Sequence, residues 1–266
     1  MGRRLRARTL FAAAAALVAG IAASQSRIPE AALAAQAQDT PEAEFHMARM
    51  IYATRGGGGG SRGWRMPWWA IDYPEAEVNF LPALARFTRL SVAKDSRHLE
   101  LTDERLFDYP WLFVQQVGQG YWMPTDTEAE RLREYLLRGG FLVVDDFHSD
   151  WEWPIFEAAI RRVLPDRAIV DIPEGDPLLE IVFPLDNRTQ IPGQRHLRGP
   201  GMPPRMEGPP RWRGIYDDDG RLMVAINFNM DMGDAWEHAD DPRYPEPMTA
   251  LAYKFAVNYL IYAMTH

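Results

Sequence analysis

Short apolar runs alternate with amphipathic stretches along most of the chain. The spacing of apolar residues predicts strands or extended segments at 47–54, 90–101, 111–114, 141–144 and 169–172. Apolar residues at helical spacing predict helices over 74–87, 125–137, 153–164 and 247–264. Strands that alternate with helices in this way are typical of a mostly parallel sheet with helices on both faces.

Local signals mark the ends of several elements. Thr125 heads a capping box at the start of one predicted helix, and Gly139-Gly140 stops that helix. Later, the apolar runs 212–216 and 222–228 flank the turn sequence Asp217-Asp218-Asp219-Gly220. Two such runs around an Asp/Gly turn predict a β-hairpin. We therefore expect an antiparallel edge on an otherwise parallel sheet.

The segment after the second glycine carries the strongest chemical signal. Phe141–Val144 is entirely apolar, as expected of a strand buried on both faces, and it is followed by Asp145, Asp146 and His148. In open α/β sheets ligands bind outside the carboxyl ends of the strands. These three residues are our candidate catalytic residues, as an acid and base pair or as cation ligands. The alternative is that one aspartate caps the next helix and the histidine packs on Trp151.

Other predicted strands are also followed by polar and aromatic side chains. After the strands near residues 54, 114 and 228, the candidate ligand-binding residues are Trp64, Trp68, Gln116, Gln119, Trp122, Asn229, Asp231 and Asp234. Further polar residues in these loops are Asp72, Asn227, Glu237 and His238. Aromatic rings with polar edges suit sugar or peptide ligands. The alternatives are that the tryptophans pack in the core and that Asp234 caps a short helix.

Because parallel strands place their carboxyl ends at one edge of the sheet, we expect these loops to gather there. The proline- and glycine-rich segment 184–210 is long for a linker and carries Arg195 and His196, which are candidates for a lid over that edge. The alternative is a solvated basic stretch. The spacing of the acidic residues and histidines fits no known metal motif, so we expect no metal and no cofactor.

The N-terminal region reads as a targeting segment. Four arginines precede an alanine-rich apolar stretch at 10–23 that is short for a membrane span. We expect a signal peptide over 1–26, a flexible tether over 27–44 and a single α/β domain over 45–266. The protein is then periplasmic or secreted, and an uncleaved leader is the alternative and the one route to a membrane.

Charge and cysteine content argue against some classes of partner and exclude some chemistry. The chain has 29 basic and 37 acidic side chains. Removal of 1–26 takes four arginines and no acid, which leaves a net charge of −12. A nucleic-acid partner is therefore not expected, because phosphate binding needs a basic face. The chain has no cysteine, which excludes disulfides and a thiolate nucleophile.

Several sequence blocks resemble a known family. They are Asp108-Tyr109-Pro110, the stretch from Glu134 to Phe141 with Asp145-Asp146, Ile191-Pro192-Gly193, Trp212-Arg213-Gly214 and the stretch from Asp231 to Trp236. Over about residues 46–265 the chain resembles the bacterial domain-of-unknown-function family 4159 (DUF4159). That resemblance implies membership of the class I glutamine amidotransferase-like superfamily and a flavodoxin-like fold. It implies no activity, and the missing cysteine excludes the amidotransferase route.

These observations leave two functions open. The first is a noncatalytic domain of the cell envelope that binds a small molecule, such as a carbohydrate, or an envelope protein. The second is a hydrolase, carbohydrate-directed or metal-assisted, that uses Asp145, Asp146 and His148.

Overall fold

The computed structural model describes residues 43–53, 67–199, 202 and 206–266. The predicted signal peptide 1–26, the tether up to residue 42 and the glycine-rich loop at 54–66 lie outside the described residues. Within the described part, no helix is both long enough and apolar enough to cross a membrane.

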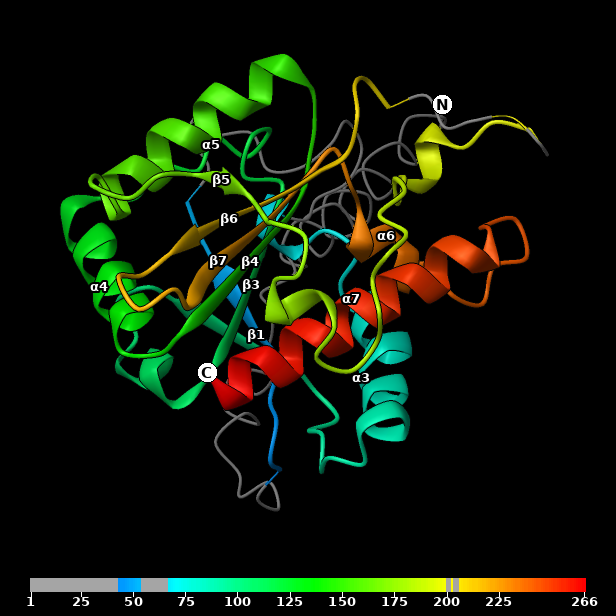
Figure 1. Cartoon of the computed structure of the whole chain (residues 1–266), viewed down its shortest axis with the longest axis horizontal. Helices are drawn as coiled ribbons and strands as arrows, with labels where there is room; N and C mark the ends of the chain where they lie inside the picture. Colours follow the sequence, from blue (N-terminus) through cyan, green and yellow to red (C-terminus); the bar gives the residue numbers. More distant parts are fainter. Residues whose placement is uncertain (1–42, 54–66, 200–201, 203–205) are drawn as a thin grey trace, which may run out of the picture. The chain divides into compact units, whose positions relative to one another are not determined.

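The described residues form a seven-stranded α/β sheet, shown in Figure 1. Its strands are β1 (Ala48–Ile51), β2 (Arg97–Glu100), β3 (Trp111–Gln115), β4 (Phe141–Phe147), β5 (Val170–Asp171), β6 (Arg211–Tyr216) and β7 (Leu222–Phe228). The strand order is β2-β1-β3-β4-β7-β6-β5. Strands β2, β1, β3, β4 and β7 run parallel to one another. β6 is antiparallel to β5 and β7, so the predicted late hairpin is confirmed. This mostly parallel arrangement is that of a flavodoxin-like fold.

In the described part of the chain, five α-helices accompany the sheet. They are α3 (Glu75–Thr88), α4 (Asp126–Leu137), α5 (Ser149–Val163), α6 (Met232–Glu237) and α7 (Glu246–Thr265). Figure 1 shows α4 and α5 on one side of the sheet and α3 and α7 on the other. The helix predicted over 153–164 begins four residues earlier than expected, which places His148 at its N-cap position.

Alternation along the central strands explains this three-layer arrangement. Trp111 and Phe113 of β3 pack in the cluster that contains α3, α6 and α7 residues, whereas Leu112 and Val114 pack with α4 and α5. Successive side chains of a strand point to opposite faces. A strand that is apolar at every position therefore needs a helical layer on each side, as the sequence pattern predicts.

The Gly-Gly stop before β4 has a steric basis. The capping box at the start of α4 is present, because the Thr125 hydroxyl accepts from the amide of Glu128 and the Glu128 carboxylate accepts from the amide of Thr125. At the other end Gly139 has a φ of 109°, which side chains rarely adopt. A Cβ on Gly140 would collide with the ring of Tyr135. The two glycines thus let the chain turn tightly from α4 into β4.

A buried ion pair holds the segment after β1 against the sheet. Arg49 of β1 is fully buried, and its Nε lies 2.5 Å from an oxygen of Glu77 in α3. The same guanidinium donates to the carbonyl of Ile71 at 3.1 Å and to the side chain of Gln115. Arg49 therefore joins β1, β3, α3 and the segment before α3 in one hydrogen-bonded unit.

We expect Arg49→Met to lower the free energy of unfolding by about 3–5 kcal/mol, because it leaves the buried Glu77 carboxylate without its partner. The double variant Arg49→Met/Glu77→Leu should recover a large part of this loss. Urea denaturation of the four proteins in the cycle measures both effects. A double variant no more stable than Arg49→Met would contradict this interpretation.

Candidate functional site

Three parallel strands end at one edge of the sheet in an unusual backbone conformation. Gln116 after β3, Asp146 in β4 and Asn229 after β7 have φ values of 54°, 51° and 58°. Asp72, in the segment between β1 and α3, has a φ of 63°. Non-glycine residues seldom adopt this left-handed conformation, and such residues cluster at functional sites. The predicted gathering of the loops after β3, β4 and β7 at one edge is present.

A β-bulge at the end of β4 contains both aspartates, Asp145 and Asp146. Val144 pairs with Ile226 and Phe147 with Phe228, so β4 holds one residue more than β7 over this interval. Both Val144 and Phe147 pack on the α4 and α5 side. The extra residue re-aims the side chains between them, as bulges do. Asp146 is thereby directed into the cavity at the strand ends, whereas Asp145 stays buried beneath it.

Asp145 holds the N-terminus of α6. Its Oδ2 accepts from the amides of Met232 at 2.8 Å and Gly233 at 3.1 Å, and its Oδ1 accepts from Asn227 at 3.3 Å. Burial and the charge of Asp146 raise the pKa of Asp145 well above its usual value. An aspartate does therefore bind a helix terminus, but the helix is α6 and not the α5 helix that follows in sequence.

Asp146 has a different environment. Its Oδ2 accepts from the side-chain amide of Gln116 at 2.5 Å, and its Oδ1 lies 2.9 Å from Nε2 of His148. Burial alone would raise the pKa of Asp146, but hydrogen bonding and charge from His148, together with the charge of Arg195, hold it below its usual value. The ring of His148 lies beside that of His196, and Trp151 instead lies beside Tyr121.

The loop after β7 supplies a second pair of carboxylates. Asp231 is the N-cap of α6, because its Oδ1 accepts from the amide of Asp234 at 2.8 Å. The alternative in which Asp234 is the cap of this short helix is therefore wrong. The Asp234 carboxylate instead accepts from the amide of Gln194 at 2.7 Å. Asp72 reaches the same region from the β1 side, where its Oδ2 accepts from Gln115 at 2.5 Å.

The segment around Gln194 lies against the β7 loop. The amide of Asp231 donates to Ile191 at 2.9 Å, and Tyr244 donates to Pro192 at 2.7 Å. A Cβ on Gly193 would stand 2.6 Å from Asp231 Oδ2, so a larger residue here would displace the Asp231 side chain. Arg195 is thereby placed on the cavity, whereas His196 is not among its lining residues.

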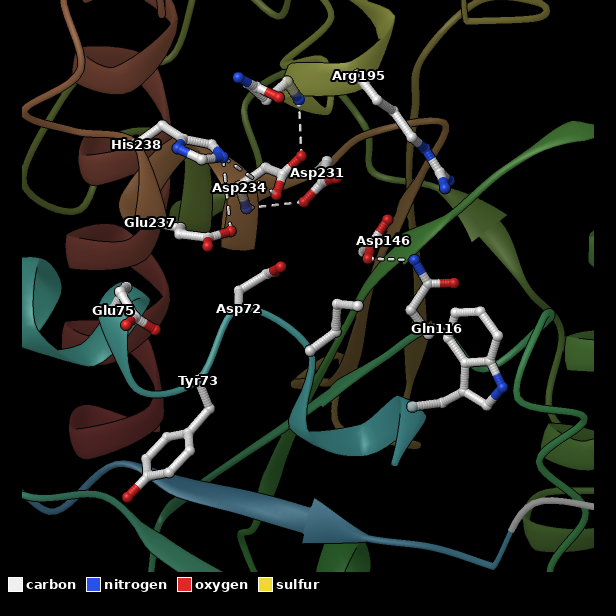
Figure 2. A pocket seen from close by; sticks show the side chains of 13 residues that line it. Asp72, Tyr73, Glu75, Gln116, Asp146, Arg195, Asp231, Asp234, Glu237 and His238 are labelled. Atoms are coloured by element: carbon white, nitrogen blue, oxygen red, sulfur yellow. Dashed lines mark hydrogen bonds and ion pairs between the residues drawn. The ribbon is translucent and has the colours of Figure 1, made fainter. Parts of the chain in front are cut away.

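These elements enclose a cavity of about 320 Å³, shown in Figure 2. The residues that line it are Trp68, Ile71, Asp72, Tyr73, Glu75, Gln116, Asp146, Gln194, Arg195, Asp231, Asp234, Glu237 and His238. Six of them carry a carboxylate, and among the described lining residues Arg195 is the one with a permanent positive charge. The cavity is therefore strongly acidic.

Burial and mutual repulsion raise the pKa of three of these carboxylates. Burial and then the charge of Asp234 raise the pKa of Asp72 well above its usual value. Burial and then the charge of Asp146 do the same for Asp231. Burial and the charge of Asp234 raise the pKa of Glu237 to about 7. The folded protein thus retains protons here at pH values where the unfolded chain has released them.

Three groups in and beside the cavity have donor atoms spaced to hold a metal ion. They are Asp146, His148 and Asp231; Asp72, Asp231 and Asp234; and Asp234, Glu237 and His238. In each group the donor atoms lie within 4.8 Å of one another. The residues of the first two groups come from different strand ends and form no sequence motif, whereas Asp234, Glu237 and His238 lie on α6 and its C-cap.

The predicted ligand-binding residues divide into two sets. Trp68, Gln116, Asp231 and Asp234 line the cavity. Trp122 is buried in the core between the sheet and α4 and α5, and Asn229 binds the amide of Ser149 and the carbonyl of Pro209. Gln119 hydrogen-bonds Glu152, and Trp64 lies outside the described residues.

Tyr73 and Glu75 are among the lining residues that were not singled out from the sequence. Their one sequence signal is their position between Asp72 and the apolar face of the predicted helix at 74–87. That position reads equally well as an ordinary helix start. Nothing local indicates that Arg49 and Gln115 draw this segment over the strand ends.

The two aspartates of β4 should respond differently to substitution. Asp145→Ala leaves the buried amides of Met232 and Gly233 without their acceptor, so we expect a loss of at least about 1–3 kcal/mol of unfolding free energy. Asp146→Asn keeps one acceptor oxygen and a residue that tolerates left-handed backbone, so its stability should stay within about 1 kcal/mol of wild type. Chemical denaturation measures both, and an unaffected Asp145→Ala protein would contradict the structural role of Asp145.

Comparisons with known proteins place the chain in a family without an assigned function. No curated protein matches the chain. Residues 52–264 match the family described as "Domain of unknown function (DUF4159)". The match begins directly after β1 and ends in the last turn of α7. With four-fifths of its residues inside that match, the chain belongs to the DUF4159 family.

Proposed function

We propose that the acidic cavity binds a hydroxyl-rich small molecule, and that a carbohydrate is the class its lining suits best. The observation that carries the proposal is the excess of acceptors over donors. Asp72, Asp231, Asp234 and Glu237 converge there, and Arg195 is the one permanent cation among the described lining residues. A ligand that fits must supply donors, and sugar hydroxyls donate to carboxylates in charge-assisted hydrogen bonds.

The apolar part of the lining supports the same class. Trp68 and Tyr73 line the cavity beside the carboxylates. Small-molecule sites combine aromatic surface with a few polar groups that fix orientation. A sugar ring offers an apolar face for the aromatics and equatorial hydroxyls for the carboxylates. A volume of about 320 Å³ is at the lower end for ligand pockets, which suits one or two sugar units.

In this proposal the domain binds rather than transforms its ligand. Asp145, one of the three candidate catalytic residues, has both oxygens engaged by α6 and Asn227. A carbohydrate-directed hydrolase is the second candidate. It is favoured by the contact between Asp146 and His148, 2.9 Å apart beside the cavity, which is an arrangement of an acid and a base.

Binding of soluble glycans to the folded domain tests the proposal. We expect a glycan array to retain the wild-type protein on a defined sugar class. Asp72→Asn should weaken that binding at least tenfold, because it removes one charged acceptor. The control Asp218→Asn, which changes an exposed carboxylate paired with Arg167, should leave binding unchanged. A wild-type protein that no glycan retains would overturn the carbohydrate proposal, and glycan cleavage by the wild type would favour the hydrolase.

The same Asp72→Asn variant should be more stable than the wild type at neutral pH. Because the pKa of Asp72 is raised in the folded state, ionising it costs folding free energy, and stability falls as pH rises above the unfolded value of about 4. The asparagine removes that penalty and tolerates the left-handed backbone. We expect a gain of about 1 kcal/mol at pH 7.5 that shrinks toward pH 4. Melting curves across this range measure it, and a destabilised variant at pH 7.5 would contradict the repulsion.

We also propose that the domain acts in the cell envelope. The arginines followed by the alanine-rich stretch at 10–23 support export, and the absence of cysteine does not contradict it, because an exported chain can lack cysteine. We expect the mature protein in the periplasmic fraction, with its N-terminus close to residue 27. Fractionation followed by N-terminal sequencing tests this, and a full-length cytoplasmic product would overturn it.

A further inference from the structure

Asp146, His148 and Asp231 form the most buried of the three metal-spaced groups. Their exposed fractions are 2 %, 7 % and 4 %, whereas the members of the group of Asp234, Glu237 and His238 are all half-buried. One donor atom from each of the three lies within 4.8 Å of the others. The group also differs in chemistry from the cluster of Asp72, Asp231 and Asp234, because it adds an imidazole nitrogen to the carboxylates.

Two unpartnered polar atoms lie in and beside this group. Nδ1 of His148 has no hydrogen-bond partner among the described residues, nor has Oε1 of Gln116, whose other amide atom donates to Asp146. Gln116 lines the cavity and is 3 % exposed. Figure 2 shows its nitrogen turned to Asp146 and its oxygen turned away from it. Buried polar atoms are nearly always satisfied, so the unpartnered nitrogen of His148, which belongs to the group, indicates that a bound group completes the arrangement, whereas the Gln116 oxygen is turned away from it.

We infer that Asp146, His148 and Asp231 bind a divalent transition-metal ion of the Mn²⁺ or Zn²⁺ type. This inference rests on the proposed function in one respect, namely that the acidic cavity is the binding site. The ion would be held at the wall of the cavity where β4 and β7 end. It would place a positive charge next to the carboxylates that otherwise repel one another.

The ligand set selects the class of ion. Carboxylate oxygens alone suit Mg²⁺ and Ca²⁺, whereas an imidazole nitrogen suits first-row transition metals. A mixed set of two carboxylates and one imidazole therefore favours Mn²⁺ or Zn²⁺ over Ca²⁺. Two aspartates also balance the double charge of the ion. The three side chains come from a bulged strand, a helix N-cap and the N-cap of another helix, which are rigidly held positions.

Titration of the EDTA-treated wild-type protein with MnCl₂ tests the inference directly. We expect one bound Mn²⁺ per chain by electron paramagnetic resonance and a rise in melting temperature with ion concentration. Pulsed measurements on the bound ion should detect coupling to an imidazole ¹⁴N nucleus. This signal is independent of any activity and requires no variant.

Conservative variants then assign the ligands. His148→Gln should abolish the ¹⁴N coupling, and Asp231→Asn should weaken Mn²⁺ binding at least tenfold while asparagine retains the N-cap role. The matched control Asp218→Asn should bind Mn²⁺ as the wild type does. Circular dichroism and melting curves confirm that each variant is folded before it is titrated.

Several outcomes would overturn the inference. Absence of Mn²⁺ and Zn²⁺ binding by the wild type is one, and affinity unchanged in Asp231→Asn is another. A ¹⁴N coupling that survives His148→Gln and disappears in His238→Gln would move the ion to the group of Asp234, Glu237 and His238. Glycan binding by EDTA-treated protein without any metal binding would overturn this inference alone, whereas metal binding without any glycan would overturn the carbohydrate proposal alone.

Discussion

The bond between the Asp145 carboxylate and the first amides of α6 is the contact on which the site depends. It joins the end of β4 to a helix that begins 87 residues later in the chain. The N-terminus of a helix carries unpaired amides and a partial positive charge, so a buried carboxylate is a natural partner for it. Because α6 is fixed in this way, Asp231, Asp234 and Glu237 face Asp146 across one cavity. The same contact explains why two adjacent aspartates differ, since one holds the helix and the other is free to face a ligand.

The cavity is held together at a cost in electrostatic free energy. Carboxylates that share a buried space repel one another, and the chain offers few cations in return. Stability alone would favour amides or apolar residues at these positions. Left-handed backbone at Asp72, Gln116, Asp146 and Asn229 adds strain at the same edge. Strain and repulsion are thus concentrated at the strand ends, and a bound ligand that relieves them, as we propose, would account for their presence there.

Most of the fold could be predicted from local sequence patterns. The all-apolar strands, the capping box at Thr125 and the turn at 217–220 predict β3, β4, α4 and the hairpin, because each depends on neighbouring residues only. The part of the candidate site that could be predicted is the set of residues that follow the parallel strands, because parallel strands bring their carboxyl ends to one edge of the sheet. What could not be predicted depends on contacts between distant segments. Trp122 looked like a ligand residue but is buried under α4, and Tyr73 and Glu75 reach the cavity because Arg49 and Gln115 hold the segment that carries them.

The end of β3 brings an amide side chain to the same edge of the sheet. Gln116 follows the buried strand β3 and has a left-handed backbone conformation. Its backbone amide donates to the backbone carbonyl of Asp146 in β4 at 3.1 Å, which holds it in place. At this position the chain carries an amide side chain that orients a carboxylate. No thiol exists anywhere in the sequence. The chemistry available at this edge is therefore that of oxygen acceptors and imidazoles around Asp146 and Asp231. Such groups hold hydroxyls and cations, and the arrangement of the strand ends accounts for both.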